Sequence, residues 1–393
     1  MSSRSQRVAI VHDWLDTWRG GENVLAEIVH LYPRAELFAL VDFLPDAQRA
    51  RLGGKRARTT FLQHIPGARR HFRGMLPLFP RAIESLDLSG FDTIISSSHA
   101  VAKGVRTASG QRHVCYCHTP MRYAWDLRAQ YLATTGLDRG VKGWLAQRML
   151  DRLRDWDRRT SARVSQFVAN SHFIAERIRR CYERDAVVVY PPVDTRFFTP
   201  HENAAPPAER DYFFTASHWV PYKRIDLIAA AFRDLSGARL IVAGTGPEGP
   251  RIRAQASPNV EFVGDMPRER LRELMRGARA FVFAAEEDFG IMPVEAQACG
   301  TPVIAYGRGG VLESVVTGEL ATGLLFHEQS AAAIAAAIAA FDRMASRFEV
   351  AACRASAERF TVDRFRTEFL RVMEAADDVE NTNRSVMAVQ AAQ

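Results

Sequence analysis

The sequence predicts an α/β protein of two domains, each built on a doubly wound parallel sheet. Three observations support this prediction. The chain has 393 residues, which is longer than a single hydrophobic core usually serves. Short apolar segments alternate with helical segments along most of its length. A Pro-Pro pair at 191–192, followed by a polar Ala/Pro-rich stretch over 200–210, separates two such series.

The first series opens on the apolar strand 8–11, which passes through Arg19-Gly20-Gly21 into a helix over 22–30. A strand, a glycine turn and a helix are the usual start of a doubly wound domain. A second helix is expected over 171–181. The further expected strands of this series are 38–41, 93–96, 113–117, 167–170 and 187–190.

The second series has the same alternation. Its expected strands are 212–215, 240–243, 260–263, 280–284 and 302–305, and its expected helices are 225–232, 331–341 and 362–375. We therefore predict a first domain over 1–192 and a second over 193–361. The polar segment 377–393 is predicted to be a disordered tail.

Two glutamates with seven residues between them form the most informative motif. Glu287 follows the strand 280–284, and Glu295 lies on a helix that begins near Met292-Pro293, where proline is well tolerated. Between them, Phe289, Gly290 and Ile291 offer backbone N–H groups at a helix N-terminus. Because hydroxyls favour carboxylate acceptors and phosphates favour N–H groups and cations, this pattern indicates a phosphorylated sugar as ligand.

Glycine turns follow three of the expected strands, at Gly20-Gly21, at Gly244-Thr245-Gly246 and at Gly307 to Gly310, which includes Gly309. Such turns let backbone N–H groups approach phosphate oxygens closely. None is a Gly-x-Gly-x-x-Gly fingerprint in the first strand-turn-helix or a Gly-Lys-Ser/Thr loop, which argues against a nicotinamide dehydrogenase and an ATPase.

Two further polar residues follow the ends of expected strands and are candidates for ligand binding. Lys223-Arg224 follows the strand 212–215, and Lys223 could hold a diphosphate as a point charge. Its alternative role is that of an exposed surface lysine. His118 follows the strand 113–117 and could hydrogen-bond a sugar hydroxyl or position an acceptor. The alternative for His118 is a structural histidine, and His12 shares its placement.

Positive charge is concentrated in the first half of the chain. The net charge is +7, with +12 in residues 1–200 and −5 in the remainder. From Arg49 to Ile83 there are nine basic residues and no acid, with Leu76-Pro77-Leu78-Phe79-Pro80 among them. Basic charge beside exposed apolar groups fits an anionic membrane surface, and an ordinary solvated surface is the alternative. Nucleic acid is disfavoured because no recognition motif accompanies the charge.

Compartment and membrane topology follow from composition. No apolar run approaches the about 20 residues of a membrane span. The five cysteines are scattered, and Cys115 and Cys117 lack Cys-x-x-Cys spacing. Buried thiols in a reducing cytoplasm are the expected state of these side chains.

Taken together, these segments resemble a known family. The carboxylate motif, Val220-Pro221-Tyr222-Lys223-Arg224, Arg19-Gly20-Gly21-Glu22 and the stretch from His118 to Asp126 look like retaining glycosyltransferases of family 4 with the GT-B fold. More narrowly, they resemble bacterial mannosyltransferases of O-antigen and exopolysaccharide assembly. The likeness runs from about Val8 to Ala375. It implies two Rossmann-like domains facing a cleft, with the helix 362–376 crossing back onto the first domain.

The resemblance also implies roles for individual residues. Glu295 would bind the donor ribose, and Glu287 would contact the transferred sugar, with backbone contacts from Phe289, Gly290 and Ile291. Lys223 would neutralise the diphosphate, and His118 would face the donor sugar. Together with Glu287, these two are the predicted catalytic residues. The remaining positions implied in donor binding are Gly20, Gly21, His218, Arg224, Gly244, Gly309 and Gly310.

One position departs from the family pattern. His218 stands five positions before Lys223, where such enzymes usually carry arginine. A neutral imidazole holds a diphosphate less firmly than a guanidinium does. Weaker donor binding, pH-dependent donor binding or lost activity are the expected alternatives.

The predicted function is retaining transfer of mannose from GDP-mannose to a lipid-linked acceptor in bacterial surface polysaccharide synthesis. The protein would lie on the inner face of the cytoplasmic membrane through residues 49–83, and would need no metal or other cofactor. The two glutamates are not expected to act as a hydrolase pair. The alternatives are a transferase that uses a UDP-sugar, an epimerase or phosphorylase on the same fold, and a non-catalytic sugar-nucleotide-binding scaffold.

Overall fold

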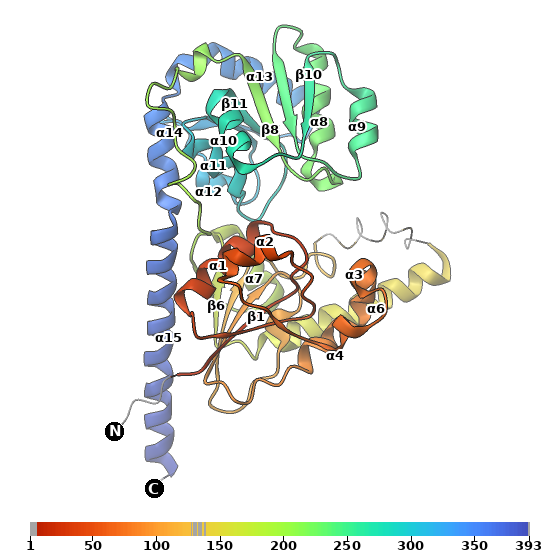
Figure 1. Cartoon of the computed structure of the whole chain (residues 1–393), viewed down its shortest axis with the longest axis vertical. Helices are drawn as coiled ribbons and strands as arrows, with labels where there is room; N and C mark the ends of the chain where they lie inside the picture. The colour runs from red at the N-terminus through yellow and green to blue at the C-terminus, as the bar shows by residue number, and fades with distance from the viewer. Residues whose placement is uncertain (1–5, 127, 129–131, 133–135, 137–138, 392–393) are drawn as a thin grey trace. The chain divides into compact units, whose positions relative to one another are not determined.

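The structure is a computed structural model that describes residues 6–126, 128, 132, 136 and 139–391. The chain forms two compact units (Figure 1). The first unit comprises Met1–Tyr190 and Phe365–Gln393, and the second comprises Pro191–Arg364. The α/β class with two parallel-sheet, Rossmann-like domains is confirmed. The sequence predicts a domain boundary after residue 192, and the two units of the structure divide after Tyr190.

A parallel sheet of seven strands forms the centre of the first unit, in the order β3-β2-β1-β4-β5-β6-β7. The strand order reverses between β1 and β4, and α/β sheets bind ligands at the carboxyl ends of the strands at such a switch point. The strands are β1 (Val8–His12), β2 (Glu36–Ala39), β3 (Arg58–Thr59), β4 (Thr93–Ser98), β5 (Arg112–Cys117), β6 (Gln166–Ala169) and β7 (Ala186–Val188).

The helices of the first unit bury apolar stripes against this sheet. Helix α6 is an example, because its buried residues Ala146, Leu150 and Leu153 recur at helical spacing. The helices are α1 (Gly20–Leu31), α2 (Asp46–Arg49), α3 (Ala68–His71), α4 (Phe79–Glu84), α6 (Gly140–Ser161) and α7 (His172–Tyr182), with 3₁₀ turns η1 (Ala50–Leu52), η2 (Phe61–His64), η3 (Phe72–Leu78) and η4 (Ala102–Gly104).

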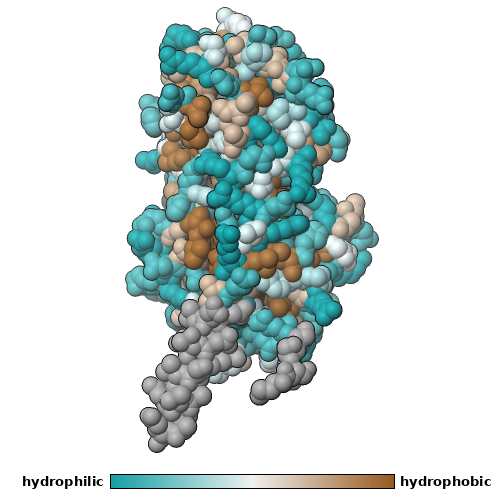
Figure 2. Space-filling model, turned by 90° about the vertical axis from the view of Figure 1, so that its left-hand side faces the viewer, coloured by the Kyte–Doolittle hydropathy of each residue, from teal (hydrophilic) through white to brown (hydrophobic). Residues whose placement is uncertain are grey.

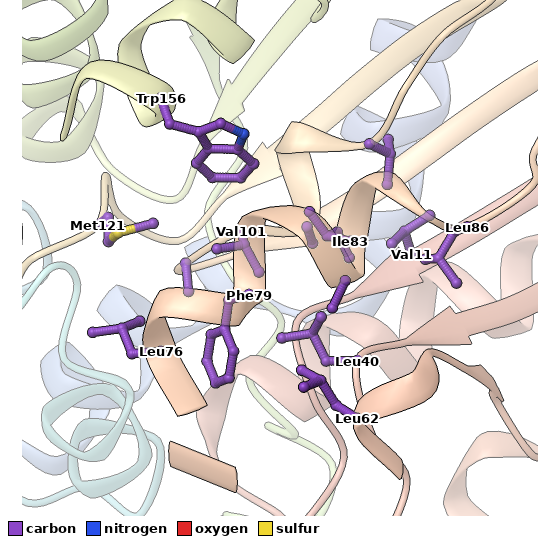
Figure 3. Close-up of a cluster of buried hydrophobic side chains, with 14 of the residues drawn as sticks. Val11, Leu40, Leu62, Leu76, Phe79, Ile83, Leu86, Val101, Met121 and Trp156 are labelled. Atoms are coloured by element: carbon purple, nitrogen blue, oxygen red, sulfur yellow. The ribbon is translucent and has the colours of Figure 1, made fainter. Parts of the chain in front are cut away.

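The apolar residues of the basic 49–83 stretch divide between core and surface. Leu76 and Phe79 are buried in the core cluster of Figure 3, together with Trp156 of α6. The expectation that Leu76 and Phe79 lie exposed beside the basic charge is therefore wrong, because their side chains belong to the hydrophobic core of the first unit. Leu78 and Phe61 remain on the surface, each 41% exposed.

The last helix, α15 (Val362–Ala391), belongs to the first unit from Phe365 onward. Phe365 and Phe369 pack against Tyr116 of β5. The expected crossing of this helix onto the first domain is thereby confirmed. Its length differs from the prediction, since the helix continues from residue 377 to Ala391, where a disordered tail is expected, and no proline or glycine interrupts this part of the sequence. The last two tail positions, 392–393, lie outside the described residues.

A parallel sheet of six strands forms the second unit, in the order β10-β9-β8-β11-β12-β13, with its own switch point between β8 and β11. The strands are β8 (Tyr212–Ala216), β9 (Arg239–Ala243), β10 (Val260–Gly264), β11 (Ala278–Phe283), β12 (Val303–Tyr306) and β13 (Gly323–Phe326). The helices are α8 (Ile225–Ala231), α9 (Gly249–Gln255), α10 (Arg268–Gly277), α11 (Ile291–Ala298), α12 (Val311–Ser314), α13 (Ala331–Met344) and α14 (Val350–Ala357). Short 3₁₀ turns are η5 (Pro207–Glu209), η6 (Pro221–Lys223), η7 (Phe232–Asp234), η8 (Ala345–Arg347) and η9 (Glu358–Phe360).

Hydrophilic residues cover most of the face drawn in Figure 2, where hydrophobic residues form small separate patches. A search of the described residues finds no helix with the length and apolar character needed to span a bilayer.

Candidate functional site

An ion pair between Lys223 and Glu287 stands at the switch point of the second sheet. Lys223 ends η6, which follows β8, and Glu287 lies in the loop that follows β11. The Lys223 Nζ donates a hydrogen bond to Glu287 Oε1. Both side chains are about one-fifth exposed, so bulk salt screens this pair less than a fully solvated one. The fold thus joins the two residues that sequence analysis assigns to the diphosphate and to the sugar.

The Gly309-Gly310 turn packs directly on the loop that carries Glu287. Glu287 and Gly309 form an isolated parallel bridge, and the Gly310 N–H donates to the Glu287 carbonyl oxygen over 2.8 Å. A Cβ atom on Gly309 would lie 2.3 Å from that same oxygen, and φ at Gly309 is +81°. Glycine is therefore required here for close backbone approach. The Gly310 N–H therefore has a hydrogen-bond partner within the protein. The sequence predicts instead that this N–H group binds a phosphate oxygen.

Helix α11 carries Glu295 and starts directly after the Phe289-Gly290 pair. Gly290 is the residue before the helix and has φ +87°, a left-handed conformation that favours glycine. The Phe289 ring is buried against Phe360, with centroids 5.2 Å apart, so this side chain anchors the loop. Glu295 is half-buried within the helix, and Ile291 begins it.

Three further predicted donor residues lie around β8 and β9. Arg224 has φ +53° and pairs with Asp226 over 3.2 Å. Gly244 follows β9, and its N–H donates to the Gly264 carbonyl over 2.8 Å. A Cβ on Gly244 would lie 1.9 Å from the Ser217 oxygen, so this glycine also serves close packing. His218 is exposed, and its ring has no hydrogen-bond or ion-pair partner among the described residues.

His118 lies at the switch point of the first sheet, in a separate group of polar side chains. Ser97 at the end of β4 places its Oγ 2.9 Å from His118 Nε2. His12 at the end of β1 places Nδ1 3.0 Å from the Ser97 carbonyl oxygen and 3.1 Å from Ser97 Oγ. Gly21 lies beside the His118 ring, where a Cβ would meet Cε1 at 3.6 Å, and Gly20 begins α1 just before it.

The carboxylates of this group bind the protein itself. Asp13 is fully buried, and its two oxygens accept the N–H groups of His99, Ala100, Val101 and Ala102 over 2.6–3.0 Å. Asp13 therefore holds the loop that follows β4. Glu22 accepts the Arg19 N–H over 2.7 Å and lies 3.6 Å from His12 Nε2.

The histidines differ in protonation. Burial alone would lower the pKa of His12, but the adjacent Glu22 outweighs it, and the pKa is raised. Burial alone would raise the pKa of Glu22, but His12 lowers it. Burial, and then the charges of His99 and His12, hold the pKa of His118 well below its usual range. Glu22 thus favours the protonated form of His12, whereas burial favours the neutral form of His118.

The predicted site residues therefore form two groups, one in each unit. Sequence analysis did not assign a role to Ser97, Asp13 or Glu22, although each stands at a strand end or directly after the first glycine turn. In the described part of the chain, no set of three or more His, Cys, Asp or Glu side chains is arranged to hold a metal ion.

Two family models match consecutive parts of the chain. Residues 18–197 match "Glycosyltransferase Family 4", and residues 198–346 match "Glycosyl transferases group 1". Together with the two parallel sheets, these matches fit the GT-B fold class. The first part of the chain is similar to the family 4 model, and the second part is similar to the group 1 model.

Curated relatives match over less than half of the chain. A D-inositol 3-phosphate glycosyltransferase of Mycobacteroides abscessus is 34% identical over 185 residues, which is 41% of this chain and 41% of that protein. The protein of that name from Mycolicibacterium smegmatis is 29% identical over 176 residues, which is 39% of this chain and 40% of its own length. The chain thus spans about two-fifths of the length of these curated relatives.

Solved structures match over nearly the whole chain. Sucrose-phosphate synthase from Thermosynechococcus elongatus superposes with a TM-score of 0.71 at 19% identity, covering 95% of this chain and 100% of that one. Anabaena HepE in complex with UDP-glucose gives a TM-score of 0.65 at 18% identity, covering 94% and 99%. At these identities the likeness shows the fold.

Proposed function

We propose that this protein transfers a sugar from a nucleotide diphosphate donor with retention of anomeric configuration. The observation that carries the proposal is the pairing of Lys223 with Glu287 at the switch point of the second sheet. A cation for a diphosphate and a carboxylate for sugar hydroxyls stand together there, beside a helix N-terminus. The curated relatives named as glycosyltransferases, and the structure of HepE in complex with UDP-glucose, support the same class.

The chemical task of these residues is to stabilise charge. As the bond from the anomeric carbon to the diphosphate breaks, negative charge grows on the leaving phosphate. Lys223 is the fixed cation for that charge, and His218 is a weaker second donor. Glu287 accepts hydrogen bonds from the sugar, and Glu295 accepts them from the ribose. This scheme uses no metal, so we expect transfer to continue in excess EDTA.

For the donor we propose GDP-mannose, on the resemblance of the motifs that contain Glu287, Lys223 and His118 to bacterial mannosyltransferases. A UDP-sugar is the second candidate, because HepE, which shares the fold, was solved with UDP and with UDP-glucose. A thermal-shift panel of GDP-, UDP-, ADP- and dTDP-sugars separates the two. GDP-mannose should give the largest shift, and a clear preference for a UDP-sugar would overturn the mannosyl assignment.

For the acceptor we propose a lipid-linked saccharide at the inner face of the cytoplasmic membrane. Arg69, Arg70 and Arg81 are exposed on the first unit, as are Phe61 and Leu78. These groups can face anionic headgroups and the interface.

Helix α6 offers further apolar groups on the same unit. Trp144 and Leu145 are each 56% exposed, and Val141 is also exposed. Lys142, on the same helix, is an exposed cation among them. An aromatic ring with basic neighbours suits the headgroup level of a bilayer.

Two assays test the acceptor proposal. Sedimentation with vesicles of anionic phospholipid should be lost when Arg69, Arg70 and Arg73 are replaced by glutamine. Unchanged sedimentation would contradict the membrane surface. Transfer to extracted lipid-linked saccharides should exceed transfer to free inositol 3-phosphate, the acceptor suggested by the names of the curated relatives. The reverse preference would indicate that the acceptor is a small soluble phosphate.

A non-catalytic sugar-nucleotide-binding scaffold is the remaining alternative, and the exposed His218 is the observation that favours it. Turnover of the bound donor separates the two. A wild-type protein that binds donor but transfers nothing to any lipid acceptor would favour the scaffold. His218→Arg should then increase donor affinity without creating turnover.

A further inference from the structure

Three hydrogen-bonding groups at the carboxyl end of the first sheet form a directional chain from His12 through Ser97 to His118. β1 and β4 pair with His12 opposite Ser97, which brings these two residues to the same level of the sheet. His118 follows β5, the next strand, and its own N–H donates to the Ser98 carbonyl over 2.8 Å. The backbone register of the sheet therefore places His12, Ser97 and His118 next to one another.

The direction of the first hydrogen bond follows from the Ser97 carbonyl. His12 Nδ1 lies 3.0 Å from that oxygen, and a carbonyl oxygen can only accept. Nδ1 of His12 therefore carries a proton. The same N–H faces Ser97 Oγ at 3.1 Å, so the hydroxyl oxygen also accepts from it. The other ring nitrogen of His12 faces the Glu22 carboxylate at 3.6 Å, an arrangement that suits a protonated Nε2.

The direction of the second hydrogen bond follows from the first. Ser97 Oγ accepts from His12, which leaves its own O–H to donate. His118 Nε2 lies 2.9 Å away and is the acceptor within reach of that hydroxyl among the described residues. A neutral imidazole that accepts at Nε2 carries its proton on Nδ1.

We propose that Ser97 is a positioning residue that holds His118 in the Nδ1–H tautomer, so that His118 presents an N–H donor to its ligand. The group opposite Nδ1 is then an acceptor oxygen, such as a sugar hydroxyl or a phosphate oxygen. His118 binds and orients that oxygen and takes no proton from it. The tautomer is a property of this network alone, and only the ligand contact rests on the proposed function.

The surroundings of the ring support a fixed orientation. The Tyr116 ring packs edge-on against His118, with centroids 5.1 Å apart, and Gly21 lies close to the same imidazole. His99 lies 6.4 Å away, centroid to centroid. Burial of the ring, and then the proximity of His99 and His12, lower the pKa of His118 and favour its neutral form.

The direct test is a two-bond ¹H–¹⁵N correlation spectrum of the full chain labelled with ¹⁵N-histidine. His118→Asn assigns the signals of His118. We expect a protonated Nδ1 and an unprotonated Nε2 on His118 in the wild-type protein. A protonated Nε2 on neutral His118 would overturn the proposal, and this result is read from the wild-type spectrum once the variant has assigned the signals.

Variants of Ser97 then test the cause. Ser97→Ala should move His118 towards the Nε2–H tautomer, and Ser97→Thr, which keeps the hydroxyl, should restore Nδ1–H. An unchanged tautomer in Ser97→Ala would show that Ser97 does not fix it, and would overturn the proposal. Because a neutral hydrogen bond contributes about 1 kcal/mol, we also expect about a fivefold fall in transfer in Ser97→Ala and its recovery in Ser97→Thr.

The two readouts separate the inference from the proposed function. A tautomer that changes as expected, with transfer unaffected, keeps the Ser97 assignment and overturns the ligand contact of His118. A protein with the expected tautomer and no transfer to any acceptor leaves the network assignment supported and counts against the proposed function.

Discussion

Lys223 and Glu287 form an ion pair although 64 positions of sequence separate them. The register of the second sheet makes this possible, because β8 and β11 are parallel neighbours and both residues follow the carboxyl ends of those strands. In the proposed function, Lys223 binds the diphosphate and Glu287 binds the sugar. In this structure the two groups pair with each other, and in the proposed function each of them also binds part of the donor.

Glu287→Gln separates the two roles of this pair. Removing the carboxylate charge frees Lys223, so GDP or UDP without a sugar should bind about threefold more tightly, since a partly exposed ion pair is worth about 0.5–1 kcal/mol. Sugar transfer should fall more than about tenfold, because a neutral amide accepts hydroxyl hydrogen bonds less strongly than a carboxylate. Calorimetric titration measures the first effect and initial rates measure the second.

The neighbouring Glu286 provides the control, since it is exposed and carries the same charge one position away. Glu286→Gln should leave both quantities close to wild type. Weaker nucleotide binding in Glu287→Gln would show that Glu287 assists the diphosphate, and would contradict the competition between the two groups.

Gly309→Ala tests the close approach of the glycine turn to the Glu287 loop. The new Cβ would lie 2.3 Å from the Glu287 carbonyl oxygen, so the loop must shift and donor binding should be lost. Backbone strain and the clash together should cost about 2 kcal/mol, which lowers the melting temperature by roughly 4–8 °C.

Gly318 is the matched control, because its φ is also positive, at +107°, and nothing lies within 4 Å of a Cβ built there. Gly318→Ala carries the backbone strain without the clash. It should therefore lower the melting temperature less and keep donor binding. Equal losses in the two variants would assign the effect to φ alone.

His113 predicts a dependence of stability on pH. Burial lowers the pKa of this histidine to about 3, so the folded protein cannot protonate it between pH 6.5 and pH 4. The unfolded chain takes up that proton below about pH 6.5, and stability is lost as the pH falls. In His113→Gln, the slope of unfolding free energy against pH in this window should decrease by about 1.4 kcal/mol per pH unit.

Chemical denaturation at several pH values measures this slope. His64→Gln, at an exposed position of the first unit, should keep the wild-type slope. A His113→Gln protein with the wild-type slope would show that His113 becomes protonated in the folded state.

Apolar runs predicted most of the two sheets, because a strand covered on both faces is continuously hydrophobic. Two edge strands were missed. β3 has two residues, and β13, Gly323–Phe326, follows a polar glycine-containing loop. Helix α6 was also missed, because charged residues dominate it. The spacing of Ala146, Leu150 and Leu153 was the signal that could have revealed it.

The individual residues of the candidate site could be predicted from the sequence, but the contacts between them could not. Lys223 and Glu287 were each assigned to the ligand, and their contact depends on loop paths that no local pattern encodes. The Gly309-Gly310 turn was assigned to phosphate, which stays a prediction, and its packing on the Glu287 loop was not foreseen. Ser97 was not assigned a role, although three consecutive serines, Ser96-Ser97-Ser98, end an apolar strand. The burial of Leu76 and Phe79 could not be predicted from the 49–83 stretch alone, because their core cluster draws residues from distant segments such as Val11 and Val101.

Calorimetric titration of nucleotide sugars into the wild-type protein and Lys223→Ala tests the central claim most directly. The wild type should bind a GDP- or UDP-sugar at one site per chain. Lys223→Ala should bind it at least about tenfold more weakly, because the diphosphate loses a charged hydrogen bond worth about 1.5–3 kcal/mol. Lys142→Ala, which removes an exposed lysine of α6, should bind as the wild type does. Equal affinity in Lys223→Ala, or no nucleotide sugar bound by the wild type, would contradict the account.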